Sequence, residues 1–207
     1  MKLTKKVWFI DEDPDQRSTY GKVLQDIFMA KFQVISIEPK QTIVEMKFIV
    51  DDPETSSIII DERLKDTGIA SYLGIDLARY FRSLNDKLPI YILTTYSEDS
   101  DLKQNQWSVE YVIKKEDLEN DLKTVKARLQ RSVSFYYDFV DERERRFNEL
   151  LAKSLNRPIS KEETEELENL QYIRTRSILV DEIGLSADLE DKINKQLKLL
   201  DQLQKGA

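Results

Sequence analysis

Short apolar runs that end in charged or hydroxyl residues are the feature that most constrains this chain. Residues 7–10, 58–60, 90–93 and 111–113 form continuous runs that are rich in β-branched and aromatic side chains. Such runs are typical of strands that are buried on both faces of a parallel sheet, and helical patterns separate them along the chain. The sequence therefore predicts an α/β fold.

A polar residue directly follows each apolar run. Asp11 and Glu12 follow the first, Asp61 the second, Thr94 the third and Lys114 the fourth. In an open α/β sheet the ligands bind at the carboxyl ends of the strands, so we expect these side chains to share one crevice. Three carboxylates repel one another unless a cation lies between them, and oxygen ligands without His or Cys suit Mg²⁺. A magnesium site beside a hydroxyl and an ammonium group favours phosphoryl transfer.

Four segments, in this order, resemble the motifs of bacterial response-regulator receiver domains. They are the acidic turn at residues 10–14, the strand end Ile60-Asp61, the run at residues 88–94 and the run at residues 111–114. The resemblance covers about the first 120 residues, which is the size of one domain. It implies a receiver domain over residues 1–120, with a flavodoxin-like, doubly wound sheet of five parallel strands in the order 2-1-3-4-5.

The resemblance also implies how the protein works. Asp61 is expected to accept a phosphoryl group from a phosphohistidine on a histidine kinase or phosphotransfer protein. Thr94 and Lys114 are expected to bind the new phosphoryl oxygens, and Tyr111 to turn inward when Thr94 moves. The chain would then be a signalling protein of a phosphorelay rather than an enzyme.

The metal ligands that the resemblance implies are the carboxylates of Asp11, Glu12 and Asp61 with the main-chain carbonyl of Arg63. The sequence departs from the family pattern nearby, because Lys115 stands where a proline usually follows the lysine and the loop after Asp61 is several residues longer than usual. No charged position of the motif set is missing, which favours a divergent receiver.

Two other functions are compatible with these residues. In a pseudo-receiver the fold is kept as a scaffold and phosphorylation plays no part. In a Mg²⁺-dependent phosphatase that resembles haloacid dehalogenases, Asp11 would be the nucleophile and Asp13 an acid/base. That family's acidic pair after a later strand is missing beyond Lys114, and Asp61 would have no role. A structural alternative also exists, because Asp11 and Asp13 could simply cap a helix that begins at Pro14.

Composition and charge limit the kinds of site, the partners and the cellular location that we expect. The 207 residues include no cysteine and no histidine, so we expect no disulfide, no thiolate metal site and an external phosphoryl donor. The net charge of −7 argues against general affinity for nucleic acids. We expect a cytoplasmic protein, since we find neither a signal peptide nor a run that could span a membrane.

Residues 121–207 are expected to form a helical extension. An apolar stripe from Leu118 to Leu151 predicts one helix over residues 117–156 that ends at Arg157-Pro158. Ser160 and Glu163 are typical of a capping box that opens a second helix, and a third is expected from Ser186. The stripe predicts a homodimer, through a coiled coil of the long helix, or docking of another protein. DNA binding is not expected, because the third helix begins with acidic residues.

Overall fold

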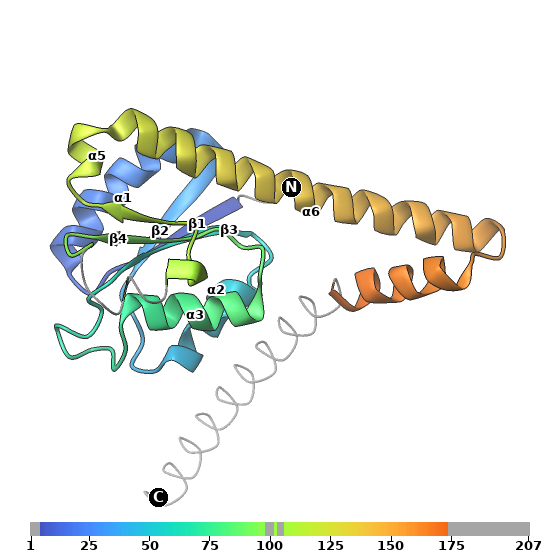
Figure 1. Ribbon diagram of the computed structural model, residues 1–207, viewed down its shortest axis with the longest axis horizontal. Coiled ribbons are helices and arrows are strands. Elements are labelled where there is room, and N and C mark those ends of the chain that lie inside the picture. Colours follow the sequence, from blue (N-terminus) through green and yellow to red (C-terminus); the bar gives the residue numbers. More distant parts are fainter. Residues whose placement is uncertain (1–4, 98–101, 103–105, 174–207) are drawn as a thin grey trace, which may run out of the picture. The chain divides into compact units, whose positions relative to one another are not determined.

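A parallel sheet of five strands forms the centre of the N-terminal part of the chain (Figure 1). The computed structural model describes residues 5–97, 102 and 106–173. Its strands pair in the order β2-β1-β3-β4-β5, and every pair is parallel. They are β1 (Lys5–Ile10), β2 (Phe32–Ile37), β3 (Thr55–Asp61), β4 (Ile90–Thr94) and β5 (Tyr111–Lys114). The predicted fold class is confirmed, including the strand order.

Helices connect these strands and continue beyond them. The longer ones are α1 (Pro14–Phe28), α3 (Gly74–Leu84) and α6 (Leu122–Asn156). The shorter ones are α2 (Phe48–Asp51), α5 (Asp117–Asn120) and the 3₁₀ helices η1 (Met29–Lys31), η2 (Ile43–Lys47) and η3 (Gln106–Ser108). Within the described residues, no helix combines the length and the apolar character needed to cross a membrane.

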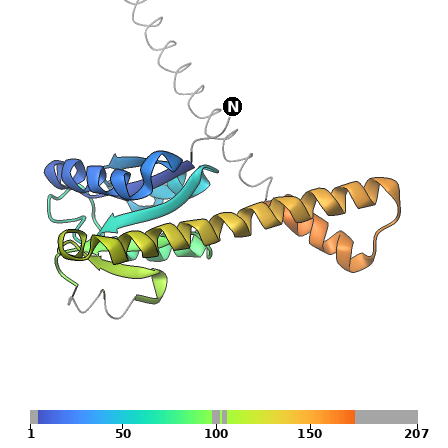
Figure 2. The same cartoon turned by 90° about the horizontal axis from the view of Figure 1, so that it is seen from above.

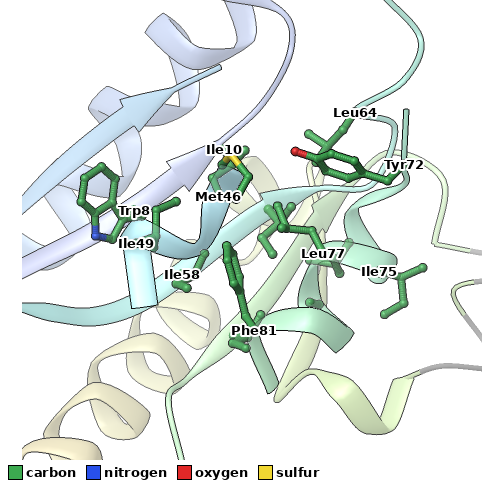
Figure 3. Close-up of a cluster of buried hydrophobic side chains, with 14 of the residues drawn as sticks. Trp8, Ile10, Met46, Ile49, Ile58, Leu64, Tyr72, Ile75, Leu77 and Phe81 are labelled. Atoms are coloured by element: carbon green, nitrogen blue, oxygen red, sulfur yellow. The ribbon is translucent and has the colours of Figure 1, made fainter. Parts of the chain in front are cut away.

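The two faces of the sheet carry separate apolar cores, because successive side chains of a strand point to opposite faces. Trp8 and Ile58 face α2 and α3 and belong to the core shown in Figure 3. Phe9 and Ile59 belong to the other core, with residues of α1 and the start of α6. Both of these helices run across that face (Figure 2). The runs at residues 7–10, 58–60 and 90–93 are fully buried, as a strand that is covered on both faces requires.

The first helix begins where the sequence predicts. The Asp13 carboxylate accepts hydrogen bonds from the amides of Asp15 and Gln16, and Pro14 occupies the first helical position. Asp11 Oδ1 in turn accepts a hydrogen bond from the Asp13 amide at 2.9 Å. Asp13 therefore caps α1. Asp11 stabilises the turn before this helix through Oδ1 only.

The chain divides into two compact units, Met1–Arg143 and Glu144–Ala207, so that α6 contributes residues to both. In the first unit Val125, Leu129 and Val133 of α6 belong to the core on the α1 side of the sheet. The Gln130 side chain also donates a hydrogen bond of 2.7 Å to the Ile27 carbonyl of α1. The boundary at residue 120 stays a prediction, but α6 completes the first unit well beyond it.

The second unit contains the end of α6 and a following helix over residues 161–173. Ser160 and Glu163 form the expected capping box, since Glu163 N donates to Ser160 Oγ and Ser160 N donates to the Glu163 carboxylate. Arg146 donates two hydrogen bonds, of 2.8 and 2.7 Å, to the Glu166 carboxylate. The helix expected from Ser186 lies outside the described residues.

The phase of the apolar stripe differs from the prediction near the end of α6. Phe147 and Leu150 are buried, whereas Leu151, which we expected in the stripe, is partly exposed. Leu122, at the other end, is also exposed. The single helix expected over residues 117–156 is wrong in one respect, because the non-helical backbone of Asp121 separates α5 from α6. An ideal helix has 3.6 residues per turn, so a stripe counted in steps of three and four drifts around the helix over this length.

We expect Gly74→Ala to destabilise the first unit by about 3 kcal/mol, because overpacking that must displace main-chain atoms is costly. A Cβ at Gly74 would lie 2.1 Å from the Asp61 carbonyl oxygen. Gly21→Ala is the matched control, since its Cβ would meet only the rotatable Ser36 hydroxyl and alanine favours the helix. Urea unfolding measures both free energies, and equal stability of the two variants would contradict the close approach at Gly74.

Candidate functional site

Three of the predicted side chains meet at the carboxyl edge of the sheet. Asp61 ends β3 and Thr94 ends β4, while Asp11 directly follows β1. All three are nearly inaccessible to solvent. They come close because β1, β3 and β4 are neighbours and parallel, so that their carboxyl ends lie at one edge.

Lys115, and not Lys114, is the cation of this site. Lys115 Nζ lies 2.8 Å from Asp61 Oδ1 and 3.4 Å from Asp11 Oδ2. It also donates a hydrogen bond of 3.2 Å to Gln16 Oε1 of α1. The side chain of Lys114 is 45% exposed and its ammonium lies 3.7 Å from Glu116 Oε1. In this structure Lys114 therefore lies apart from the carboxylates, and its role at the phosphoryl group stays a prediction.

The alternation of side chains along β5 explains this difference. Val112 packs against the core on the α3 side of the sheet and Ile113 belongs to the core on the α1 side. The Lys115 amide donates to the Thr94 carbonyl, so the chain stays beside β4 for one residue beyond the strand. Alternation then turns Lys114 away from the α1 side and Lys115 toward it, where Gln16 and the ring of Tyr20 lie.

The Asp61 carboxylate is held through both of its oxygens. Oδ1 contacts the Lys115 ammonium, and Oδ2 accepts a hydrogen bond of 2.7 Å from the Arg63 amide. The Arg63 carbonyl, a predicted metal ligand, accepts a hydrogen bond from the Asp66 amide at 3.2 Å. The Arg63 guanidinium lies 3.7 Å from the centre of the Tyr96 ring, which joins the loops that follow β3 and β4.

Negative charge at this edge is only partly balanced. Burial, with repulsion from Asp61, raises the pKa of Asp11 to about 6. Burial also raises the pKa of Glu12 to about 7, and Asp61 and Asp11 add to this effect. Burial alone would lower the pKa of Lys115, but its hydrogen bond and ion pair with Asp61 outweigh burial and raise it. The Lys115 ammonium thus balances only part of the negative charge of the three carboxylates of Asp11, Glu12 and Asp61.

The donor set fits a divalent cation in its chemistry. Glu12 Oε2 is buried and has no hydrogen-bond partner in the part of the chain that the structure describes. An unpartnered carboxylate oxygen beside Asp11 and Asp61 is a suitable ligand for Mg²⁺, which prefers oxygen ligands and usually keeps several waters. The same described residues contain no preassembled group of three or more metal ligands. Binding of a metal would therefore require these carboxylates to rearrange around it.

Thr94 and Tyr111 differ in their placement. Thr94 Oγ1 is buried and accepts a hydrogen bond of 2.9 Å from the Tyr96 amide. Tyr111 is 38% exposed, and the Arg128 guanidinium of α6 lies 4.2 Å from the centre of its ring. Tyr111 thus lies on the outside in this structure, and its inward turn stays a prediction.

Sequence reasoning missed Glu62, which follows Asp61. Its side chain is buried and accepts a hydrogen bond of 3.0 Å from the Ile75 amide, while its carbonyl accepts one of 2.8 Å from the Gly74 amide. Glu62 therefore satisfies two amides at the start of α3, which otherwise lack partners in a helix. A second acidic residue directly after Asp61 was the available signal.

Comparison with known proteins gives structural matches only. No protein-family model matches the chain, and no curated protein matches it. The signal receiver domain of an HD domain-containing protein from Pseudomonas fluorescens matches with 12% identity and a TM-score of 0.50, over 68% of this chain and 95% of that chain. The N-terminal unit has the receiver fold.

Two further solved structures are similar. NtrX from Brucella abortus has 13% identity and a TM-score of 0.51, over 67% of this chain and 29% of that chain. The BeF3-activated DrrB receiver domain has 16% identity and a TM-score of 0.47, over 64% of this chain and 99% of that chain. At these identities the similarity concerns the fold alone.

We expect Lys115→Gln to destabilise the receiver unit by about 3 kcal/mol in EDTA, because removal of one partner leaves buried carboxylates without a counter-ion. Lys114→Gln is the matched control and should change the free energy of unfolding by less than about 0.5 kcal/mol, as exposed ion pairs contribute little. Urea unfolding at neutral pH measures both. If Lys114→Gln lost more unfolding free energy than Lys115→Gln, then Lys114 would be the cation of the site.

Proposed function

We propose that this protein is a response regulator of a phosphorelay, in which Asp61 accepts a phosphoryl group from a phosphohistidine of a partner kinase. The observation that carries this proposal is the contact of a buried aspartate at the end of β3 with a lysine ammonium, beside two further acidic residues. In the receiver fold this edge is the ligand-binding edge of the sheet. Phosphoryl transfer depends mostly on positioning and charge neutralisation, and these residues provide both.

In the proposed reaction an Asp61 carboxylate oxygen attacks the phosphorus of the phosphohistidine. A P–O bond forms, the P–N bond breaks, and the nitrogen takes the electron pair of that bond, so that the ring leaves as neutral imidazole when its other nitrogen already has a proton. The Arg63 amide fixes the carboxylate through Oδ2, and Lys115 lies beside Oδ1. The Lys115 ammonium then balances charge on the phosphoryl oxygens, and the Thr94 hydroxyl is the nearby donor that can turn toward them.

Mg²⁺, when bound, supplies the remaining positive charge at the transferring group. Asp11 and Glu12, with Asp61, would hold it, since Glu12 Oε2 is a buried oxygen without a partner in the described part of the chain. The Arg63 carbonyl, the fourth ligand that the sequence implies, would first have to release the Asp66 amide.

A phosphatase is a weaker proposal, because the Asp13 carboxylate already caps α1 through two main-chain amides. The pseudo-receiver is the other alternative, because Lys115 already pairs with Asp11 and Asp61. Under that hypothesis the charged cluster would serve stability alone, and the helical surface would carry the function.

The output that we propose is association through the long helix α6, as a homodimer or with another protein. This helix completes the receiver unit up to Arg143 and also belongs to the second unit. A change at the receiver's surface can therefore alter residues of the helix that binds the partner.

Incubation with acetyl phosphate and Mg²⁺ should yield a phosphoryl adduct on the wild type, detected by intact-protein mass. We expect the adduct to disappear in Asp61→Asn, which lacks the nucleophile, and to form more slowly in Asp11→Asn, which keeps it. An adduct that persists in Asp61→Asn and is lost in Asp11→Asn would support the phosphatase. Absence of an adduct from every variant would support the pseudo-receiver.

Mg²⁺ should raise the melting temperature of the wild type, because a ligand that binds only the folded state stabilises it by about 1.4 kcal/mol for each tenfold excess over its Kd. Glu12→Gln should respond in two opposite ways. In EDTA it should melt higher than the wild type, since it removes a poorly balanced buried charge, and with Mg²⁺ it should gain less. An unchanged Mg²⁺ response would remove Glu12 from the ligand set.

A further inference from the structure

The side of α6 that faces away from the receiver core has an unusual composition. Phe135 lies at its centre and is 75% exposed. Residues three, four and seven positions from Phe135 share its face of the helix, whereas Val125, Leu129 and Val133 lie on the opposite, buried face. We call the residues around Phe135 the outer face of α6. They are Arg128, Arg131, Ser132, Phe135, Asp138, Phe139 and Glu142.

Charges on this outer face separate by sign. Between residues 123 and 131 α6 has four basic residues and no acidic one, and between residues 138 and 144 it has four acidic residues and one basic residue. Arg128 and Arg131 precede Phe135, and Asp138 and Glu142 follow it. All four are exposed, and Arg128 also contacts the Tyr111 ring.

Charges of like sign lie close together along this face of α6. Arg128 and Arg131 are like charges three residues apart, and Asp138 and Glu142 are like charges four residues apart, so each pair repels within the helix. Two basic residues before Phe135 and two acidic residues after it form a surface that is complementary in charge to a reversed copy of itself.

We infer that two copies of this chain pair through the outer face of α6, antiparallel and with a two-fold axis at Phe135. In such a pair, residues at equal distances before and after Phe135 face each other. Arg128 and Glu142 are each seven residues from Phe135. Arg128 of one copy therefore lies opposite Glu142 of the partner subunit, and Arg131 lies beside Asp138 of the partner subunit.

The symmetry repeats these contacts, so that four ion pairs surround two stacked Phe135 side chains. A parallel pair in register would instead place Arg128 against its own equivalent and Glu142 against its own equivalent, which is repulsive. A self-complementary surface of this kind is what a two-fold interface requires. Because the contact involves about two turns on each side of Phe135, we expect a weak dimer with a Kd between about 1 µM and 1 mM.

This inference rests on the proposed homodimer and is independent of phosphoryl transfer. It predicts that Arg128→Glu/Arg131→Glu weakens self-association at least tenfold in sedimentation at increasing concentration. The matched control Lys123→Glu/Lys126→Glu changes charge equally on the same helix but lies off the outer face, and should have little effect. Adding Asp138→Arg and Glu142→Arg to the first variant exchanges both signs and should restore the dimer.

Disulfide cross-linking tests the orientation, and the absence of cysteine from the natural chain gives a clean background. Arg128→Cys mixed with Glu142→Cys should give a disulfide-linked dimer of the two variants, while neither alone should cross-link to itself. Self-cross-linking of each variant would show a parallel pair and overturn the inference while keeping the proposed dimer. A wild type that stays monomeric throughout the concentration range would overturn both.

Discussion

The contact of the Lys115 ammonium with Asp61 and Asp11 is the interaction on which the carboxyl edge of this receiver depends. Three acidic side chains follow neighbouring strands, and burial makes their repulsion expensive. Lys115 balances part of this charge and joins three strands, β1, β3 and the end of β5, while Gln16 ties the same ammonium to α1. The Lys115 ammonium thus holds the sheet edge together, and in the proposed reaction it would have to turn toward the phosphoryl group.

The sequence was sufficient for the parts of the fold that depend on burial. Continuous runs such as Ile58-Ile59-Ile60 must be covered on both faces, and their ends locate Asp11, Asp61 and Thr94 at one edge without knowledge of the structure. The end of α6 before Pro158 and the capping box at Ser160 were equally predictable, because both depend on local geometry.

Other parts depend on details that no local pattern contains. Two adjacent lysines follow Ile113, and only the path of the chain beside β4 decides which of them turns toward α1. The orientation of Tyr111 depends in the same way on Arg128, a residue seventeen positions further along the chain. The phase of the α6 stripe depends on small rotations that accumulate along the helix, which is why Leu150 is buried where Leu151 was expected.

The close approach of Gly74 to Asp61 makes the site rigid on the side of α3. The start of α3 is bonded to Glu62 through two amides, and a single added methyl group at Gly74 would collide with the Asp61 carbonyl. Densely packed main chain cannot yield in this direction. Thr95 and Tyr96 of the loop after β4 are exposed. A group that enlarges the Asp61 side chain would therefore find no space on the side of α3.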